Sequence, residues 1–579
     1  MKILGIHRGH TATAAYMEDG KIISVISEER LNRIKEWQGF PEMAVKKIFK
    51  MNAISPKEID LIVIGGKIKP TTHSDYIGKK FSVYMGGFNI FRIITPKIII
   101  KNNWWVEPII KVADLIRNKS VDYKFLENLG ISRDKIIFLD HHTAHAYTTL
   151  LNFWGQKNNM LILTLDGVGD GYSATVNKIE NGKFITIDKT NLYNSLGLLY
   201  SRVTQYLNLK PLSHEYKVMG LAAYTKEEDV NSVFERFNKD FMRIDPKNNL
   251  RMENLSKAVN HEYLKKFDKY FKNVRFDNFA GGAQKLVEEL ILQWVKNAVK
   301  QTGINEVFCS GGVFMNVKAN MRLSYAPEIK KLFVFPSCAD ESNAIGACNY
   351  GYKILCEKND KEFSLAKLNN LYLGPEYSGR EIKIALEKYK SKINFKNIEK
   401  INEFIASKLA EGEIVARYSG RMEFGARALG NRSILAHPSK REVIRIINDA
   451  IKQRDFWMPF AATILKEREK DYLINPHKVI SPFMTYSFHT TDLARKDLIN
   501  GMHNYDLTCR PQVLEKQDNP DYYEVIKNFE KKTGIGGVLN TSFNIHGEPI
   551  VCTPEDALDV FIRSGLKHLV IGKYYITKK

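Results

Sequence analysis

Cysteine is scarce in this 579-residue sequence: there are six, and none forms a C-x-x-C pair. That spacing excludes a zinc ribbon and a disulfide scaffold, and it is typical of a protein from a reducing compartment. Long apolar runs are also lacking, because even the isoleucine-rich stretch 89–100 is interrupted by arginine, proline and lysine. We therefore expect no membrane-spanning helix. His7 and Arg8 follow before any apolar signal region develops, which predicts a cytoplasmic protein.

Acidic residues are outnumbered, with 65 Asp and Glu against 86 Lys and Arg, a formal net charge of +21. Such an excess is compatible with nucleic acid, an anionic membrane or phosphorylated small molecules as partners. No localised basic stripe is evident in the sequence. We therefore interpret most of the charge as a lysine-rich surface on an enzyme, which disfavours nucleic acid as a partner.

Hydrophobic residues make up 44% of the chain, as in ordinary globular proteins, which excludes a disordered or collagen-like chain. At roughly 100–200 residues per domain, the length predicts more than one domain. Residues 356–371 are rich in lysine and asparagine and are typical of a connector. We predict two domains, 1–360 and 366–579, with residues 67–125 as an insertion of undetermined structure.

An internal repeat is the clearest feature of the first domain. Residues 3–27 and 161–187 each contain a buried-type strand, a Gly-containing polar turn, a second strand, a tight turn and a third strand. The tight turns are Asp19-Gly20 and Asn181-Gly182, which are strong hairpin signals. Two unrelated hairpins are the alternative. The shared order favours a duplicated α/β core with a cleft between its halves.

Three histidines follow the predicted strand 136–139: His141, His142 and His145. On a helix over 141–155, His141 and His145 are four residues apart and share a face, as two imidazole ligands of one metal ion require. Asp340, at a predicted strand-to-helix junction, is the candidate oxygen ligand. Solvated or helix-capping histidines are the alternative.

Glycine-rich turns at predicted strand ends are candidate phosphate sites, since their backbone N–H groups can face an anion. Each turn alone could equally be structural. The candidates are the turns 5–11 and 166–171, with Gly167, Gly169 and Asp170 in the second of them, and Gly311 and Gly312 after the strand at 307–309. His10 and Lys35 fall in or near the same predicted cleft, as a candidate base and a candidate anion holder.

The second domain carries basic residues in glycine-rich loops, a setting that favours an oxyanion pocket over a solvated helix face. Candidate anion-binding residues there are Arg427, Arg432, Lys452, Arg454 and Arg510. Uncharged candidates follow the strand-like Val538-Leu539, namely Asn540, Ser542 and Asn544.

In this order along nearly the whole chain, the motifs resemble the O-carbamoyltransferase family of antibiotic and nodulation-factor biosynthesis. The resemblance is carried by Gly5-Ile6 with His10, Asp19-Gly20, Glu28-Glu29-Arg30 with Arg33 and Lys35, the 141–146 segment, the 166–171 segment, the 215–222 segment, the 420–435 stretch, Arg510-Pro511-Gln512, and the 540–544 segment with Gly547-Glu548-Pro549. Each motif is short, but nine in a fixed order are specific.

The resemblance implies an α/β chain with a duplicated actin-like, sugar-kinase-type (RNase H-like) N-terminal domain. It implies a C-terminal domain similar to threonylcarbamoyl-adenylate synthases. Family members use carbamoyl phosphate and ATP, with Mg²⁺, to make carbamoyl-adenylate in the C-terminal domain. The carbamoyl group then passes to a hydroxyl of a small molecule in the N-terminal domain.

The same resemblance implies roles for single residues. Iron or a similar divalent ion would be held by His141, His145 and Asp340, while His10 would act as base and Lys35 would hold developing negative charge. Family members usually carry arginine where this chain has His546, so anion binding there is expected to depend on pH. A homodimer is expected by analogy. The acceptor is not specified by any motif.

Two other functions compete with this interpretation. A tRNA-modifying threonylcarbamoyl-type transferase fits the +21 charge and the similarity of both domains to tRNA-modification proteins. It predicts affinity that falls steeply with salt. A nucleotide-dependent chaperone would use only the first domain and has no need of the second domain's oxyanion pocket.

Overall fold

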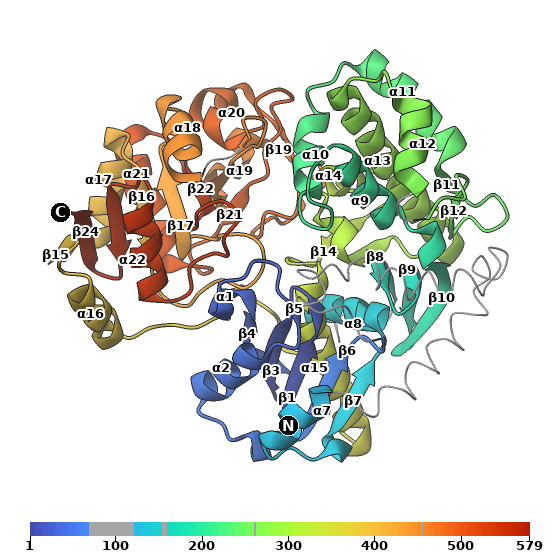
Figure 1. Cartoon of the computed structure of the whole chain (residues 1–579), viewed down its shortest axis with the longest axis horizontal. Coiled ribbons are helices and arrows are strands. Elements are labelled where there is room, and N and C mark those ends of the chain that lie inside the picture. Colours follow the sequence, from blue (N-terminus) through green and yellow to red (C-terminus); the bar gives the residue numbers. More distant parts are fainter. Residues whose placement is uncertain (69–120, 153–158, 260–261, 453–454) are drawn as a thin grey trace. The chain divides into compact units, whose positions relative to one another are not determined.

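The computed structural model describes residues 1–68, 121–152, 159–259, 262–452 and 455–579 (Figure 1). Their internal contacts divide them into two compact units, and each is described by itself. Unit 1 comprises Met1–Glu29 and Glu36–Leu368, and unit 2 comprises Arg30–Lys35 and Asn369–Lys579. Most of the predicted insertion at 67–125 lies outside the described residues.

Unit 1 contains two five-stranded sheets with one topology, in the orders β4-β3-β1-β6-β7 and β10-β9-β8-β13-β14. In each sheet the first strand along the chain pairs antiparallel with the next long strand and parallel with a later strand, which in turn pairs parallel with the edge strand. The strands are β1 (Lys2–His7), β3 (Thr13–Glu18), β4 (Lys21–Ser27), β6 (Leu61–Gly65) and β7 (Ile136–Leu139), then β8 (Met160–Gly169), β9 (Tyr172–Glu180), β10 (Lys183–Asn191), β13 (Glu306–Ser310) and β14 (Lys331–Val334). The predicted duplication is confirmed.

The two predicted hairpin turns have the backbone that their sequences favour. Asp19 and Gly20 have φ of 45° and 77°, and Asn181 and Gly182 have φ of 50° and 71°. Positive φ at both central residues defines the type I′ turn, whose twist matches that of the flanking strands.

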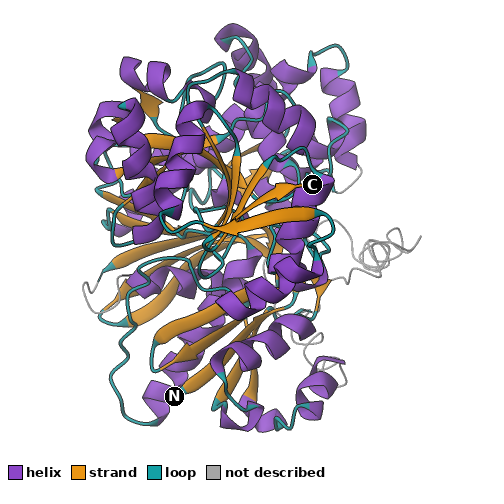
Figure 2. Cartoon of the chain, turned by 90° about the vertical axis from the view of Figure 1, so that its left-hand side faces the viewer, coloured by secondary structure: helices purple, strands orange, loops and turns teal. Residues whose placement is uncertain are grey.

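The helices of unit 1 flank its strands, as the secondary-structure view shows (Figure 2). They are α2 (Glu42–Asn52), α7 (Val121–Asn128), α8 (His141–Thr148), α9 (Leu196–Tyr206), α10 (Glu215–Ala222), α11 (Glu227–Asp240), α12 (Glu262–Phe271), α13 (Phe276–Thr302), α14 (Val317–Ser324) and α15 (Asn343–Lys358). Two short strand pairs accompany them: β2 (Gly9–His10) with β5 (Gln38–Gly39), and β11 (Met242–Ile244) with β12 (Met252–Asn254).

Helix α15 lies in backbone contact with its neighbours because two glycines make room for it. It packs against β1, β3, β6 and α8. A Cβ on Gly5 of β1 would come within 1.9 Å of the carbonyl oxygen of Ala344. A Cβ on Gly346 of α15 would come within 1.8 Å of the carbonyl oxygen of Ala144. No larger residue fits at either position without a backbone shift.

Unit 2 is built on an eight-stranded mixed sheet in the order β15-β24-β23-β16-β17-β22-β18-β21. Its strands are β15 (Ile393–Asn397), β16 (Val415–Tyr418), β17 (Arg432–Ala436), β18 (Ala461–Leu465), β21 (Gln512–Leu514), β22 (Gly537–Ser542), β23 (His568–Ile571) and β24 (Tyr574–Lys578). Its helices are α16 (Gly379–Lys388), α17 (Ile401–Glu411), α18 (Glu442–Ile446), α19 (Glu469–Tyr472), α20 (Asp492–Asp497), α21 (Pro520–Thr533) and α22 (Pro554–Arg563). A further pair is β19 (Leu473–Ile474) with β20 (His489–Thr490).

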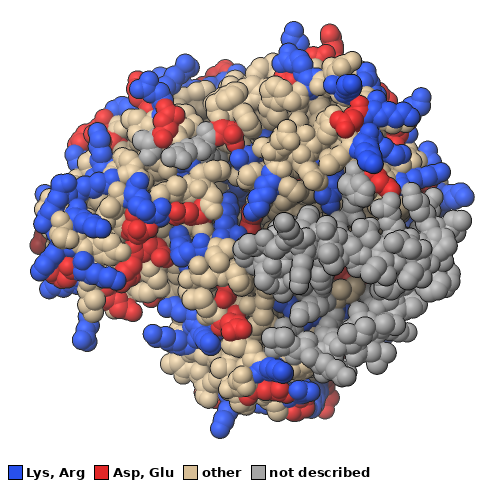
Figure 3. Space-filling model, viewed as in Figure 1, with Lys and Arg blue, Asp and Glu red and all other residues tan. Residues whose placement is uncertain are grey.

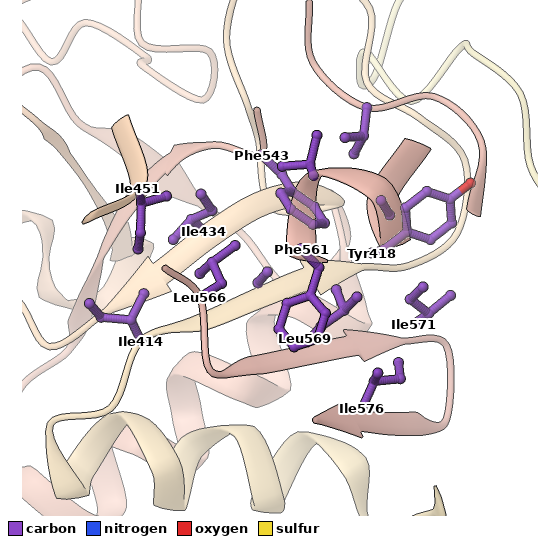
Figure 4. Close-up of a cluster of buried hydrophobic side chains, with 14 of the residues drawn as sticks. Ile414, Tyr418, Ile434, Ile451, Phe543, Phe561, Leu566, Leu569, Ile571 and Ile576 are labelled. Atoms are coloured by element: carbon purple, nitrogen blue, oxygen red, sulfur yellow. The ribbon is translucent and has the colours of Figure 1, made fainter. Parts of the chain in front are cut away.

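The core of unit 2 lies between this sheet and its helices. Phe543, Phe561, Leu569 and Ile434 meet there with other buried apolar side chains (Figure 4). Helix α22 begins at Thr-Pro-Glu-Asp, a sequence typical of a helix N-terminus: the Thr553 side chain accepts from the backbone N–H of Asp556, and a reciprocal bond completes a capping box.

The α/β fold class with two duplicated sheets in the first unit is therefore confirmed. Among the described residues, no helix has the length and apolar content needed to cross a membrane. All six cysteines are buried and free. On the face shown in Figure 3, Lys and Arg are interspersed with Asp and Glu, in keeping with a dispersed surface charge.

Candidate metal centre and candidate anion site

Two histidines of α8 face the same point at the end of the first sheet. Strand β7 ends at Leu139, and Asp140 caps the helix by accepting from the backbone N–H of Thr143. One helical turn then separates His141 from His145, and their ring centroids are 4.7 Å apart. The predicted helix is confirmed over 141–148 and continues as a 3-10 turn over 149–152. Local sequence alone therefore aligns the two imidazoles.

Two aspartates from the second half of unit 1 meet these histidines. Asp166 lies near the end of β8, and Asp340 begins the 3-10 turn Asp340–Ser342 that precedes α15. Asp166 Oδ2 lies 3.0 Å from His141 Nε2 and 3.2 Å from His145 Nε2. Asp340 Oδ1 lies 3.5 Å and 3.3 Å from the same two nitrogens. The cluster thus draws on both halves of the duplicated fold.

Neighbouring groups fix the two rings in this orientation. The Nδ1 of His145 lies 3.3 Å from the hydroxyl of Ser310, which leaves Nε2 directed at the carboxylates. A Cβ on Gly169 would stand 2.0 Å from Cδ2 of His141, so only glycine leaves space for that ring. Groups that orient an imidazole in this way are typical of metal sites.

In this cluster the pKa of each carboxyl group depends on the charges next to it. Burial alone would raise the pKa of Asp166, but hydrogen bonds with His141 and His145 hold that pKa well below its usual value. Burial, and after it the charge of Asp166, raises the pKa of Asp340 well above its usual value. Two carboxylates this close repel each other when both are ionised, and a bound cation would relieve that repulsion.

These four residues fit a divalent metal ion. One ligand atom from each of His141, His145, Asp166 and Asp340 lies within 4.8 Å of the others. Two imidazole nitrogens and two carboxylate oxygens form a donor set that suits zinc, iron or manganese. Sequence reasoning named three of the four. It placed Asp166 only in a phosphate-binding turn, although its position at a strand end in the second repeat was available as a signal.

The candidate base His10 lies beside this cluster in unit 1. Its backbone oxygen is 3.1 Å from Nε2 of His7, and that nitrogen is 3.7 Å from Asp340 Oδ2. Burial, with the charges of His141 and His145, lowers the pKa of His7 well below its usual value. Lys35 belongs to the segment assigned to unit 2, so it is described separately from His10.

The predicted phosphate turns of unit 1 surround the cluster. Gly167 donates its backbone N–H to its neighbour Asp166 at 2.6 Å. Gly311 has φ of 109°, and a Cβ at this position would collide with the backbone of Leu165. A Cβ on Gly312 would lie 2.9 Å from Asp166 Oδ1. Their role in cofactor binding stays a prediction.

Arg432 occupies a different environment from the predicted oxyanion pocket. Its guanidinium is fully buried and lies 3.6 Å from the centroid of the Tyr418 ring. It donates to the backbone oxygens of Ser419 at 2.7 Å and Gly420 at 3.1 Å, and also contacts those of Asn431 and Pro375. A phosphate could reach it only by displacing these carbonyls. The geometry is that of an arginine that supports a loop.

Lys452, Ser542 and Asn544 come together as the sequence predicts. Lys452 ends a π-helical segment, Ile447–Lys452, a distortion that often occurs at functional sites. Its ammonium donates to Oδ1 of Asn544 at 2.6 Å and to the backbone oxygen of Ser542. The Ser542 hydroxyl also donates to Asn544 Oδ1, at 2.7 Å. These three residues form the Lys452 cluster.

The remaining candidates of unit 2 divide by exposure. Asn540 is buried and donates to the backbone oxygen of Ala428 and to Thr463 Oγ1, each at 3.1 Å. Arg427, Arg510 and His546 are half-buried. Arg454 lies outside the described residues.

The segment 30–35 holds two loops of unit 2 that carry these candidates. Arg30 donates to the backbone oxygen of Gly425 at 2.8 Å. Arg33 donates to the backbone oxygens of Pro549 and Ile550 at 2.8 Å and 2.7 Å. No sequence signal singled out these contacts, because they join residues about 400 to 500 positions apart.

Comparison with known proteins finds relatives that match this chain along its whole length. An uncharacterized protein of Methanocaldococcus jannaschii is 32% identical over 591 residues, covering 100% of this chain and 99% of its own. A second uncharacterized protein of that organism is 31% identical, with 100% of each chain covered. Nodulation protein NolNO of Sinorhizobium fredii is 28% identical over 98% of this chain and 79% of its own.

Two family descriptions together match most of the sequence. Residues 2–349 match the carbamoyltransferase N-terminus, and residues 406–578 match the carbamoyltransferase C-terminus. The first match contains all four residues of the His/Asp cluster, and the second contains the Lys452 cluster. The chain belongs to the carbamoyltransferase family and is a carbamoyl-transferring enzyme.

Proposed function

We propose that this enzyme activates a carbamoyl group as carbamoyl-adenylate in unit 2 and transfers it to a hydroxyl of a small molecule in unit 1. The observation that carries the proposal is the convergence of His141, His145, Asp166 and Asp340 from both halves of unit 1. Family membership supplies the transferred group. The sugar, nucleotide-sugar or natural-product acceptor is part of the proposal.

The first step would take place at the loops around the Lys452 cluster. Carbamoyl phosphate, ATP with Mg²⁺, and one water would give carbamoyl-adenylate, orthophosphate and pyrophosphate. The ammonium of Lys452 is buried and held by oxygens of Ser542 and Asn544, so it would act on a bound phosphate through its charge and by orienting these two residues, not through a free N–H donor. A fixed cation is suited to stabilising charge on a phosphate that develops during the reaction.

Arg427, Arg510 and His546 complete the proposed anion site, since half-buried side chains can still meet a ligand. Arg432 would not contact the substrate and would act indirectly, through the loop that it supports. By binding the backbone oxygens of Ser419 and Gly420, it holds the start of the loop that leads to Arg427.

The second step would take place beside the His/Asp cluster. A divalent ion held there, proposed to be iron, would neutralise the carboxylates and stabilise the phosphate of the departing AMP. The acceptor hydroxyl would attack the carbamoyl carbon as the bond from that carbon to the phosphate oxygen breaks. His10 would take the hydroxyl proton. The charge-stabilising role of Lys35 rests on the family resemblance alone.

The proposal is tested by incubating the full-length protein with ATP, Mg²⁺ and radiolabelled carbamoyl phosphate. We expect pyrophosphate release without acceptor, and label transfer with AMP release when a library of hydroxylated metabolites is added. Lys452→Met should abolish the first step, while His145→Ala should retain pyrophosphate release and lose transfer. Absence of pyrophosphate under all conditions would overturn the adenylate step. Label transfer to tRNA that weakens steeply with salt would overturn the small-molecule acceptor.

A further inference from the structure

Asp170 is a buried carboxylate beside the candidate metal centre that is not one of its four ligand residues. It follows Gly169 in the turn between β8 and β9, with φ of 49°, and is 6% exposed. The sequence placed it among cofactor-binding residues because it lies in a glycine-rich turn. Its contacts point to another task.

Both carboxylate oxygens of Asp170 accept hydrogen bonds from backbone N–H groups. Oδ2 accepts from His141 and from Lys67, each at 2.8 Å, and Oδ1 accepts from Ile68 at 2.6 Å. Lys67 and Ile68 follow β6, and His141 is the first residue of α8. One side chain from the second sheet thereby binds two segments of the first sheet's half.

These bonds are of the strong kind. A carboxylate that accepts from N–H groups makes charge-assisted hydrogen bonds, and an anion is favoured at the first turn of a helix. An asparagine in its place would keep one acceptor oxygen and direct an NH₂ group at backbone donors. That substitution alters hydrogen bonding while hardly changing side-chain volume.

Three residues in the segment 166–170 contribute to the candidate metal centre, each in a different way. Asp166 supplies a candidate ligand, Gly169 leaves space for the His141 ring, and Asp170 binds the backbone of His141. We propose that Asp170 is a positioning residue that holds His141 in register with Asp166 and thereby sets the affinity of the centre for a divalent ion. This rests on the metal role in the proposed function.

The test measures metal binding directly, without an activity assay. Full-length protein treated with a chelator is titrated with Mn²⁺ and with Zn²⁺ by calorimetry, and folding is checked by circular dichroism. Asp170→Asn is expected to weaken affinity 10–100-fold, as for other residues that orient ligands. Asp188→Asn is the matched control, because Asp188 is a buried aspartate of unit 1 that binds Arg251 and Asn248.

The outcomes separate this inference from the proposed function. Wild-type affinity in folded Asp170→Asn overturns the role of Asp170 alone, and so does an equal loss in Asp188→Asn. Weakened ATP binding with unchanged metal affinity also overturns it and returns Asp170 to the cofactor site. A wild-type protein that binds neither ion overturns the metal role itself. If Asp170→Asn does not fold, Asp170→Glu is measured in its place: the longer side chain displaces the carboxylate from the backbone N–H groups of His141, Lys67 and Ile68, so an unchanged metal affinity would overturn the positioning role.

Discussion

The charged groups of the two units are satisfied in different ways. In unit 1, His141, His145, Asp166 and Asp340 face one another, so each of these titratable groups has another titratable group as a neighbour. In unit 2, Arg432 is surrounded by neutral backbone oxygens, and Arg417 is held by Asp521 and by the backbone oxygen of Gly430. The first arrangement brings two carboxylates together at a point where a bound cation would neutralise them, whereas in the second the guanidinium groups are satisfied within the fold.

This difference teaches which sequence patterns indicate a site. Arginines in a glycine-rich loop supply cations, but a buried guanidinium can use all its donors on the loop itself. Histidines at i and i+4 after a strand leave less freedom, since the helix determines where both nitrogens point. The number of charged residues in a loop is therefore a weaker indicator of a binding site than a spacing that makes two side chains point the same way.

The largest expected effect comes from removing a candidate ligand. His145→Ala should lower divalent-metal affinity at least ~100-fold, because it removes one of four donors where even residues that only orient ligands are worth ~10–100-fold. Metal content after dialysis, measured by atomic emission, provides the check. His142→Gln is the control, since His142 lies three residues away and binds Thr164 Oγ1 instead. Equal metal loss in both variants would contradict the assigned cluster.

A single methyl group should have the next largest effect on this centre. Gly169→Ala places a Cβ 2.0 Å from the His141 ring, whereas at Gly167 the nearest atom is Leu198 Cδ2 at 3.9 Å. We expect Gly169→Ala to lose most metal binding and carbamoyl transfer, and Gly167→Ala to keep its metal affinity. Calorimetric titration with Mn²⁺ compares the two variants. Retention of affinity in Gly169→Ala would show that His141 is dispensable.

In unit 2 the comparison predicts a loss of stability in place of a loss of binding. Arg432→Met leaves several buried carbonyl oxygens without donors, at a cost on the order of 3 kcal/mol in unfolding free energy. Chemical denaturation followed by fluorescence measures this cost. Arg427→Met is the control: it should weaken ATP binding and leave stability nearly unchanged. The reverse pattern would place Arg432 at the ligand after all.

The smallest effect is a pH dependence from His437. Burial lowers its pKa to about 4, from an ordinary value of 6.5. Below pH 6.5 the unfolded chain takes up a proton that the folded chain refuses, so stability is expected to fall as the pH drops from 6.5 towards 4. Thermal unfolding across that range should show a shallower slope for His437→Gln than for wild type. Parallel curves would mean that the pKa of His437 does not differ between the folded and unfolded states.

Much of the fold could be read from local pattern. The tight turns after residues 18 and 180 and the capping sequence at Thr553 depend on a few adjacent residues, and all three have the expected conformation. The pairing of β8 with β13 was less accessible, because it joins residues nearly 150 positions apart. Asp166 reaches the histidines through the packing of α8 against β8, a tertiary contact that local pattern does not indicate, which explains why Asp166 was missed as a ligand.

The candidate site in unit 2 shows the opposite limitation. Sequence reasoning assigned Lys452, Ser542 and Asn544 to one oxyanion pocket from their residue types and loop setting, and in the structure they are in hydrogen-bond contact. It could not indicate that the Arg432 guanidinium meets carbonyl oxygens of Ser419 and Gly420, since backbone acceptors leave no trace in residue identity. Interactions with the main chain are where sequence reasoning loses most information.

Helix α15 has a consequence for how the protein is made. It covers β1, β3 and β6 in the first sheet, yet its residues, Asn343–Lys358, are encoded after both repeats. As the chain leaves the ribosome, strands from its first 65 residues must wait for nearly 300 more before this helix can cover them. A nascent chain halted after the first repeat would expose that apolar face and offer it to chaperones. The two halves share one topology, but the first half cannot complete its packing until the second half has been synthesised.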